Sequence, residues 1–317
     1  MMGEKFKEHA LVLSQTEIAP GIFDLRLLTE HIAGAARAGQ FVSLYCADNS
    51  RLLPRPISIC EVKCSREKTG TGGLGKETGS RNDVIRLVYR IAGEGTKEFS
   101  SLKEGDFIRI LGPLGNGFAA CADAALQAKK AGQDPDVCLT AKAPEKYILI
   151  GGGIGLPPML ELAKELTERN APAGERAAGA DSPAQNGPPC DVRIIAGYRD
   201  SNTFLLEDLK KYGKVYPATE DGSLGTRGTV LDAIREHDLS ADVIFACGPA
   251  PMLGAVKAYA AKKGITCCLS MEERMACGIG ACLACVCRSA EADSHTNVKN
   301  KRICREGPVF LAEDIEF

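Results

Sequence analysis

Four cysteines near the end of the chain have the spacing of ligands for an iron–sulfur cluster. Cys277, Cys282 and Cys285 follow a C-x4-C-x2-C pattern, and 18 residues separate Cys285 from Cys304. This is the plant-type arrangement, in which four thiolates hold a 2Fe–2S cluster. Two glycines between the first two cysteines let the loop wrap closely, because glycine tolerates positive φ. The spacing therefore predicts that these four cysteines are metal ligands.

Other metal sites fit the pattern less well. Structural zinc sites use paired, short C-x2-4-C units. A Rieske centre needs histidine ligands, and the only histidine nearby is His295. Cys287, two residues after Cys285, is the alternative ligand.

Glycine-rich turns form a second candidate site. One turn follows the apolar run Tyr147–Ile150 and precedes a helical pattern, and a second turn ends the run Val243–Ala246 in the same way. Such turns bring backbone N–H groups and a helix N-terminus to a phosphate, although a glycine-rich turn can also be purely structural. Two of them favour a dinucleotide crevice. The candidate dinucleotide-binding residues are Gly151, Gly152, Gly153, Gly155, Cys247 and Gly248.

A third group lies in the first hundred residues. Arg55 can clamp a phosphate bidentately, Ser58 and Thr96 can donate hydrogen bonds, and the ring of Tyr89 can lie against an isoalloxazine. Taken alone, each is equally consistent with an ordinary barrel residue. The candidate flavin-binding residues are Arg55, Pro56, Ile57, Ser58, Tyr89, Arg90, Gly95 and Thr96.

The elements that position these residues change type along the chain. Short apolar or alternating runs separated by turn residues predict six strands and a small antiparallel barrel. These strands are Ala10–Ser14, Ile22–Leu28, Phe41–Tyr45, Ile57–Val62, Val84–Ile91 and Phe107–Leu111.

Alternation of strands and helices begins at Tyr147 and predicts a doubly wound parallel sheet. The predicted strands are Tyr147–Ile150, Val192–Ala196, Val215–Ala218 and Val243–Ala246. One predicted helix follows Gly155. Three more cover Leu205–Tyr212, Val230–Glu236 and Met252–Lys262. The segments Ser65–Arg81, Ala119–Ala143 and Ala171–Pro189 look like insertions, and the second is an Ala-rich linker with one short helix.

Composition excludes several classes of protein. Lys and Arg total 39 and Asp and Glu total 41, so the chain lacks the basic excess of a nucleic-acid binder. Its longest apolar runs are about ten residues, against the roughly 20 needed to cross a bilayer. The N-terminus lacks an apolar signal core, so we expect a cytoplasmic protein without a disulfide framework.

Several motifs together carry a family resemblance. Arg55-Pro-Ile-Ser58, Gly112-Pro-Leu-Gly-Asn-Gly-Phe118, the Gly151–Gly155 turn and Cys247-Gly-Pro249 stand in the order of ferredoxin–NADP reductase-like flavoproteins. The stretch 270–285 and the ending 304–310 point to a narrower family within this group. They resemble the electron-transfer subunits of NAD-dependent class 1B dihydroorotate dehydrogenases.

The resemblance implies cofactors and a partner. FAD would be bound by Arg55–Ser58, by Val88, Tyr89 and Arg90, and by Gly95 and Thr96. NAD would dock on the Gly151–Gly155 face with Cys247 and Gly248 near the nicotinamide, and four cysteines would hold the 2Fe–2S cluster. The partner would be an FMN-containing catalytic subunit in a two-plus-two heterotetramer, so this chain would carry no catalytic residues for orotate chemistry. Its scattered histidines agree with that expectation.

The resemblance also defines the expected domains. We expect an FAD-binding antiparallel β-barrel over 1–118, a linker over 119–145, a doubly wound nicotinamide domain over 146–270 and a 2Fe–2S module over 271–317. The alternatives are a reductase subunit of another NAD(P)-linked complex, such as a sulfide dehydrogenase or hydrogenase, and a scaffold subunit with structural zinc. Arg199 would favour NADP and Asp200 would oppose it, so the residues leave the choice between NAD and NADP open.

Overall fold

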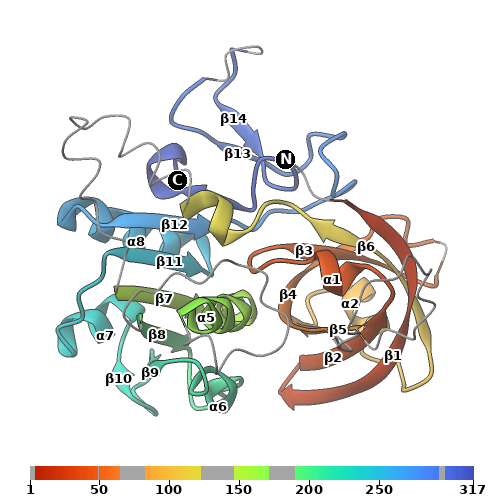
Figure 1. Ribbon diagram of the computed structural model, residues 1–317, viewed down its shortest axis with the longest axis horizontal. Helices are drawn as coiled ribbons and strands as arrows, with labels where there is room; N and C mark the ends of the chain where they lie inside the picture. Colours follow the sequence, from red (N-terminus) through yellow and green to blue (C-terminus); the bar gives the residue numbers. More distant parts are fainter. Residues whose placement is uncertain (1–3, 49, 65–82, 123–145, 171–189, 293–296) are drawn as a thin grey trace, which may run out of the picture.

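Two sheet systems, a closed barrel and an open seven-stranded sheet, contain most of the strands. The computed structural model describes residues 4–48, 50–64, 83–122, 146–170, 190–292 and 297–317. Figure 1 shows the barrel beside the sheet, with a small two-stranded module next to both. The predicted combination of an antiparallel barrel and an α/β sheet is confirmed.

The barrel is closed by six antiparallel strands in the order β1-β2-β5-β4-β3-β6. Successive residues of a strand face opposite sides of the sheet, so alternate side chains such as Val42 and Leu44 fill the interior. All six predicted strands are confirmed. They are β1 Phe6–Ala19, β2 Ile22–Thr29, β3 Phe41–Tyr45, β4 Arg55–Lys63, β5 Asp83–Arg90 and β6 Phe107–Leu114. Two short helices, α1 Ile32–Ala35 and α2 Glu94–Phe99, were not predicted.

The open sheet has the order β10-β9-β8-β7-β11-β12-β15, parallel except at β15. The four predicted strands are confirmed as β7 Lys146–Gly152, β8 Asp191–Tyr198, β9 Lys214–Thr219 and β11 Val243–Cys247. Three further strands are β10 Thr226–Arg227, β12 Thr266–Ser270 and β15 Val309–Leu311. Since β15 comes from the C-terminal segment, that segment is joined to the sheet by strand pairing.

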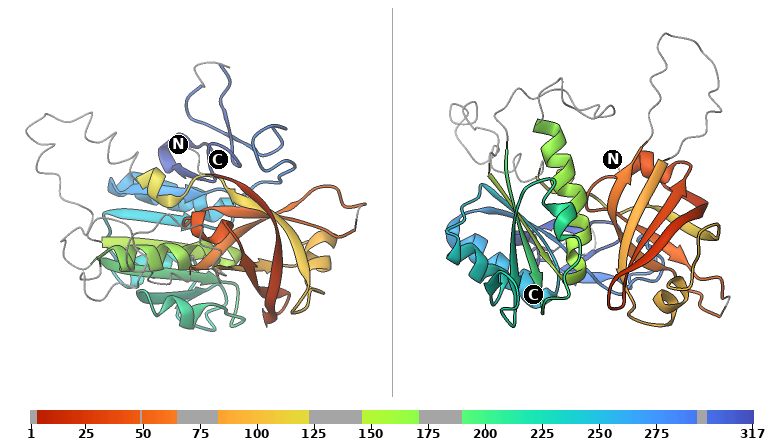
Figure 2. Two further views of the ribbon diagram at one scale, coloured as in Figure 1. Left: turned by 45° about the vertical axis from the view of Figure 1, so that its right-hand side comes forward. Right: turned by 90° about the horizontal axis from the view of Figure 1, so that it is seen from below.

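Helices cover both faces of the sheet, as a doubly wound fold requires. Figure 2 shows α5 (Leu156–Asn170) between the sheet and the barrel, and α7 (Val230–Glu236) and α8 (Ala250–Lys263) on the opposite face. The helix predicted over 205–212 is only one turn, α6 Leu206–Leu209, and the left-handed backbone of Leu205 (φ 62°) sets its start. Single-turn 3-10 helices are η1 Gly153–Gly155 and η2 Ala312–Asp314.

The C-terminal module contains the hairpin of β13 (Val286–Arg288) and β14 (Asn300–Arg302). An apolar cluster joins this module to the outside of the barrel. It comprises Phe41 and Leu114 from the barrel and Cys285, Ile303, Cys304, Phe310 and Ile315 from the module.

Most of the predicted insertions fall outside the described residues. This holds for Ser65–Arg81, for 171–189 and for 123–143, whereas residues 118–122 form a helical turn. Among the residues described, no helix is long and apolar enough to span a membrane.

Helix α5 connects the barrel to the sheet through polar contacts. The backbone N–H of Val62 in β4 donates to Glu161 Oε2 at 2.8 Å, and Lys164 Nζ donates to the carbonyl oxygen of Val62. A second connection is made by Arg86 of β5, which contacts Asp24 at 2.7 Å and Asp208 of α6 at 2.9 Å. Both connections bury charged groups between the two lobes.

The buried carboxyl group of Glu161 should make the stability of the folded chain depend on pH. It is 5% exposed, and burial raises its pKa from 4.5 to about 7, against the opposing effects of Lys164 and the Val62 N–H. Because the folded chain then holds more protons than the unfolded chain between these values, the free energy of unfolding falls as the pH rises through them. Glu161→Gln does not titrate, yet it keeps an oxygen for the Val62 N–H.

We therefore expect the stability of Glu161→Gln relative to the parent chain to increase by up to about 3 kcal/mol between pH 4.5 and pH 8. Denaturant unfolding of both proteins at each pH measures this difference. Identical pH slopes for the two proteins would contradict it.

Candidate functional site

The two predicted glycine-rich turns lie side by side at the centre of the open sheet. Strands β7 and β11 are parallel neighbours, and Gly151 pairs with Cys247 at their carboxyl ends. The chain continues from β7 toward β8 on one side, whereas β11 and β12 lie on the other. This is a topological switch point, where open α/β sheets bind ligands.

Contact between the turns leaves no room for side chains. A Cβ atom on Gly155 would lie 2.1 Å from the carbonyl oxygen of Cys247, and one on Gly152 would lie 2.6 Å from the sulfur of Met252. Gly248 has a positive φ of 158°, and a Cβ on it would lie 3.2 Å from backbone atoms of Gly152. The glycines therefore let two backbone turns meet at the start of α5, where free N–H groups can bind a phosphate.

Cys247 presents a neutral thiol at this crevice. Burial raises its pKa to about 12, although a hydrogen bond with the Ser270 side chain lowers it in part. The thiol therefore stays protonated at neutral pH and adds no charge beside a bound ring.

Arg199 and Asp200 are the two residues that bear on the choice between NAD and NADP. Arg199 is exposed, and the Asp200 carboxylate accepts the N–H of Asn202 at 2.7 Å.

Three of the predicted flavin-binding residues come together at the N-terminus of α2. A Cβ on Gly95 would lie 2.3 Å from Nε of Arg55, so the guanidinium rests directly on this glycine. Thr96 Oγ1 accepts the N–H groups of Ala92 at 2.8 Å and Gly93 at 3.2 Å, which caps the helix. The guanidinium therefore lies beside the N-terminus of α2, and the two together are suited to an anion.

The remaining flavin candidates occupy β4 and β5. Pro56, Ile57 and Ser58 are half-buried at the start of β4. On β5, Arg90 is exposed and Val88 is buried in the apolar cluster that includes α5.

The expectation that the Tyr89 ring lies against a flavin is wrong. Tyr89 faces the barrel interior, where its ring packs on Phe23 at 5.8 Å and on Phe99 at 6.4 Å. Its hydroxyl donates to Gln15 Oε1 at 3.0 Å, and burial raises its pKa. Strand alternation explains the error, because Val88 and Arg90 take the outer face and Tyr89 must then point inward.

The four predicted cluster ligands gather in the C-terminal module as two pairs. The side chains of Cys277 and Cys282 contact each other, as do those of Cys285 and Cys304. Cys304 N–H also lies 3.4 Å from Cys285 Sγ. Among the described residues, no group of three or more His, Cys, Asp or Glu side chains forms a site for a metal ion. A two-iron cluster takes two cysteine ligands at each iron, whereas a zinc ion takes four ligands at one point. Two pairs of thiols therefore suit the two-iron cluster better.

The loop after Cys277 favours a thiolate. Burial works against ionisation, but N–H groups of Ile279, Cys282 and Ala281 lower the pKa of Cys277 to about 6. The Ala281 N–H lies 3.2 Å from the Cys277 sulfur. Cys287 differs, because burial raises its pKa to about 11 and its thiol points toward the carbonyl oxygen of Lys301 at 3.5 Å.

Arg302 is a positioning residue that the sequence analysis missed. It donates to the carbonyl oxygen of Gly280 at 2.9 Å and forms an ion pair with Glu306. It thereby ties the segment that carries Cys304 to the loop that carries Cys277 and Cys282. An arginine and a glutamate four residues apart are common on protein surfaces, so no sequence signal identified this role.

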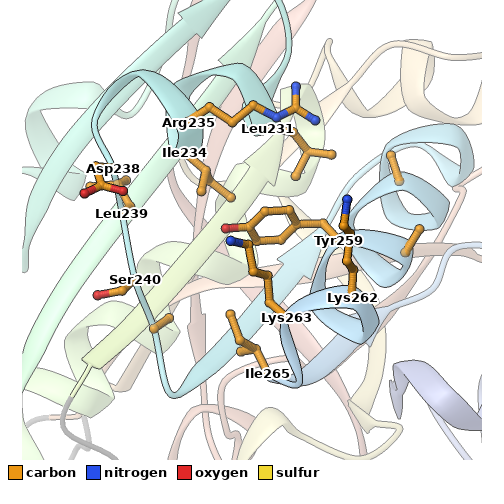
Figure 3. A pocket seen from close by; sticks show the side chains of 13 residues that line it. Leu231, Ile234, Arg235, Asp238, Leu239, Ser240, Tyr259, Lys262, Lys263 and Ile265 are labelled. Atoms are coloured by element: carbon orange, nitrogen blue, oxygen red, sulfur yellow. The ribbon is translucent and has the colours of Figure 1, made fainter.

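A separate cavity of about 910 Å³ lies between α7 and α8. Figure 3 shows Tyr259, Lys262 and Lys263 of α8 opposite Ile234 and Arg235 of α7. It contains none of the predicted site residues and lies on the sheet face opposite α5.

Comparison with known protein families gives two matches. Residues 272–316 match the family model described as the iron–sulfur cluster binding domain of dihydroorotate dehydrogenase B. Residues 149–258 match the oxidoreductase NAD-binding domain. The first range contains the four paired cysteines, and the second contains both glycine-rich turns.

Curated relatives cover almost the whole chain. An electron transfer subunit of dihydroorotate dehydrogenase B (NAD(+)) from Listeria monocytogenes is 40% identical over 306 residues, covering 96% of this chain and 97% of its own. Subunits of the same name from Bacillus velezensis and Fusobacterium nucleatum are 36% and 33% identical, each with 98% coverage of both chains.

Solved structures support the fold. A chain of the NADH-dependent reduced ferredoxin–NADP oxidoreductase has a TM-score of 0.69 at 22% identity, covering 97% of this chain and 89% of its own. A ferredoxin NADP+ reductase from Neisseria gonorrhoeae has a TM-score of 0.51 at 13% identity, covering 85% of this chain and 95% of its own.

The contact between Gly95 and Arg55 predicts a specific loss of flavin. Gly95→Ala must displace the guanidinium, and losing a hydrogen bond to a charged group costs about 1.5–3 kcal/mol, so we expect FAD affinity to fall about tenfold or more. Gly93→Ala is the matched control, because a Cβ there meets nothing within 4 Å. Flavin titration of both variants measures the effect, and equal affinities would contradict the assignment of Arg55.

Proposed function

The chain belongs to the family of electron transfer subunits of dihydroorotate dehydrogenase B, and from that premise we propose that it passes electrons through a 2Fe–2S cluster and FAD to NAD+. It is an oxidoreductase subunit, and the name of its relatives, electron transfer subunit, implies a separate catalytic partner. The overall reaction would convert dihydroorotate and NAD+ to orotate, NADH and a proton, with the orotate chemistry in the partner.

The cluster would be held by Cys277, Cys282, Cys285 and Cys304. A cluster exchanges one electron at a time, a flavin one or two, and a nicotinamide two as hydride, so a flavin must stand between the other two. The N–H groups that lower the Cys277 pKa would stabilise a thiolate ligand. Arg302 would keep the two ligand-bearing segments together through Gly280.

FAD would be bound on the outside of the barrel and NAD at the switch point of the sheet. Arg55, Gly95 and Thr96 supply the anion site, and Pro56, Ile57, Ser58, Val88 and Arg90 the neighbouring surface. Tyr89 can contribute only through its backbone, since its ring is in the barrel core. Gly151, Gly152, Gly153, Gly155, Cys247 and Gly248 would hold NAD. The preference for NAD over NADP rests on the names of the relatives.

The observation that carries this proposal is the position of Phe41. On β3 it pairs with Ser58 of the flavin candidates, and its side chain lies in the apolar cluster that contains Cys285 and Cys304. One residue of the barrel thus separates the proposed flavin surface from the proposed cluster.

We extend the proposal to the assembly. The partner would be an FMN-containing subunit in a two-plus-two heterotetramer, located in the cytoplasm. The functional boundaries would be 1–118 for FAD, 146–270 for NAD and 271–317 for the cluster, with 119–145 as linker.

Anaerobic reduction with NADH tests the relay. We expect NADH to bleach the flavin and to produce the electron paramagnetic resonance signal of a reduced 2Fe–2S cluster. Adding a dihydroorotate-oxidising FMN subunit, dihydroorotate and NAD+ should then yield NADH. A working relay without dihydroorotate-dependent NADH would indicate a different complex, and protein without flavin or iron would refute the proposal.

Replacing single cysteines tests the ligand set. Cys282→Ser should remove most of the iron and the cluster signal while FAD stays bound, because the flavin candidates lie on the barrel. Cys287→Ser is the matched control and should keep full iron content, since its thiol faces the Lys301 carbonyl oxygen. Iron analysis and flavin absorbance measure both, and iron loss in Cys287→Ser instead would reverse the assignment.

A further inference from the structure

A buried hydroxyl on the barrel faces the cluster module. On β3, Val42 and Leu44 belong to the barrel interior, whereas Phe41 belongs to the apolar cluster shared with the module. Strand alternation therefore directs Ser43, like Phe41, outward toward the module. Ser43 is 1% exposed, and its Oγ has no hydrogen-bond partner among the described residues.

The nearest part of the module is the loop that follows Cys277. A Cβ on Gly278 would lie 2.9 Å from Ser43 Oγ and 3.4 Å from Leu114 Cδ1. Gly278 has a φ of 69°, so the loop bends sharply here, directly after the first proposed ligand. Ser43 thus contacts the cysteine loop itself.

An unpaired hydroxyl in this place needs explanation. Leaving a buried donor unsatisfied is destabilising, so buried polar groups almost always have a partner. The neighbours of Ser43 offer none: Leu111 of β6 and Pro56 of β4 pair with it across the sheet, and Phe41 lies beside it. None of these strand neighbours supplies an acceptor, and the hydroxyl faces the Gly278 loop.

We propose that Ser43 is a positioning and tuning residue, whose hydroxyl donates a hydrogen bond to the sulfur atoms of the 2Fe–2S cluster and raises its reduction potential. The inference rests on the proposed function, because it requires the cluster at Cys277. Reduction adds negative charge to the cluster, and a donor aimed at its sulfurs stabilises the reduced form more than the oxidised form. Hydrogen bonds to the sulfurs are one of the means by which proteins set such potentials.

Redox titration of the loaded protein, followed by electron paramagnetic resonance, tests this inference. At the midpoint potential of the parent protein, we expect Ser43→Ala to lower the ratio of reduced to oxidised cluster about tenfold, equivalent to about 59 mV for one electron. Ser289→Ala is the matched control. It removes a hydroxyl that is also 1% exposed but belongs to the module and already donates to the carbonyl oxygen of Glu291 at 2.7 Å.

The outcomes separate this inference from the proposed function. An unchanged cluster potential in Ser43→Ala with full iron content would overturn it, and so would a shift in the flavin potential alone. An equal shift in Ser289→Ala would also overturn it, because the effect would then be a general loosening of the module. Absence of iron from the parent protein would instead refute the proposed function.

Discussion

The side-chain amide of Asn116 fixes the relation between the barrel and the cluster module. Its Nδ2 donates to the carbonyl oxygens of Glu306 and Val309 at 3.0 and 2.9 Å, and its Oδ1 accepts the Val309 N–H at 3.0 Å. The preceding Gly115 permits this contact, since a Cβ there would lie 2.4 Å from Pro308. The segment held in this way runs from Cys304 to β15. One amide therefore positions both a proposed ligand and the edge of the open sheet.

The barrel contacts the cluster module and the open sheet through different strands. The module contacts the β3 and β6 side through Phe41 and Leu114, whereas α5 contacts β4 through Val62. A chain that transfers electrons between three centres must hold them at short, fixed separations, and a closed barrel is a stiff support for this purpose. The reactive groups belong to the cofactors, and the protein contributes their placement and surroundings.

The sequence predicted those elements and motifs that are determined by residues close together in the chain. The bounds of β3 and α7, the cysteine spacing and the glycine turns all depend on residues close together in the chain. The Tyr89 ring could not be placed in the same way, because both faces of β5 carry buried residues and alternation alone does not say which is inside. Arg302, Asn116 and β15 depend on contacts across long stretches of sequence, so their roles required the fold. Ser43 was hidden because one small polar residue barely changes the pattern of an apolar strand.

The two interfaces of the barrel differ in their chemistry, and this has a consequence for electron transfer. Toward the cluster module the described contacts are apolar side chains and the neutral hydrogen bonds of Asn116, which pH and salt affect little. Toward the open sheet they include Arg86 with Asp208 and the buried Glu161, whose energies depend on ionisation. Changes in pH should therefore act on the nicotinamide end of the relay before the cluster end. A rigid cluster end suits single-electron exchange at fixed distance, while the nicotinamide end must admit and release a dissociable cofactor.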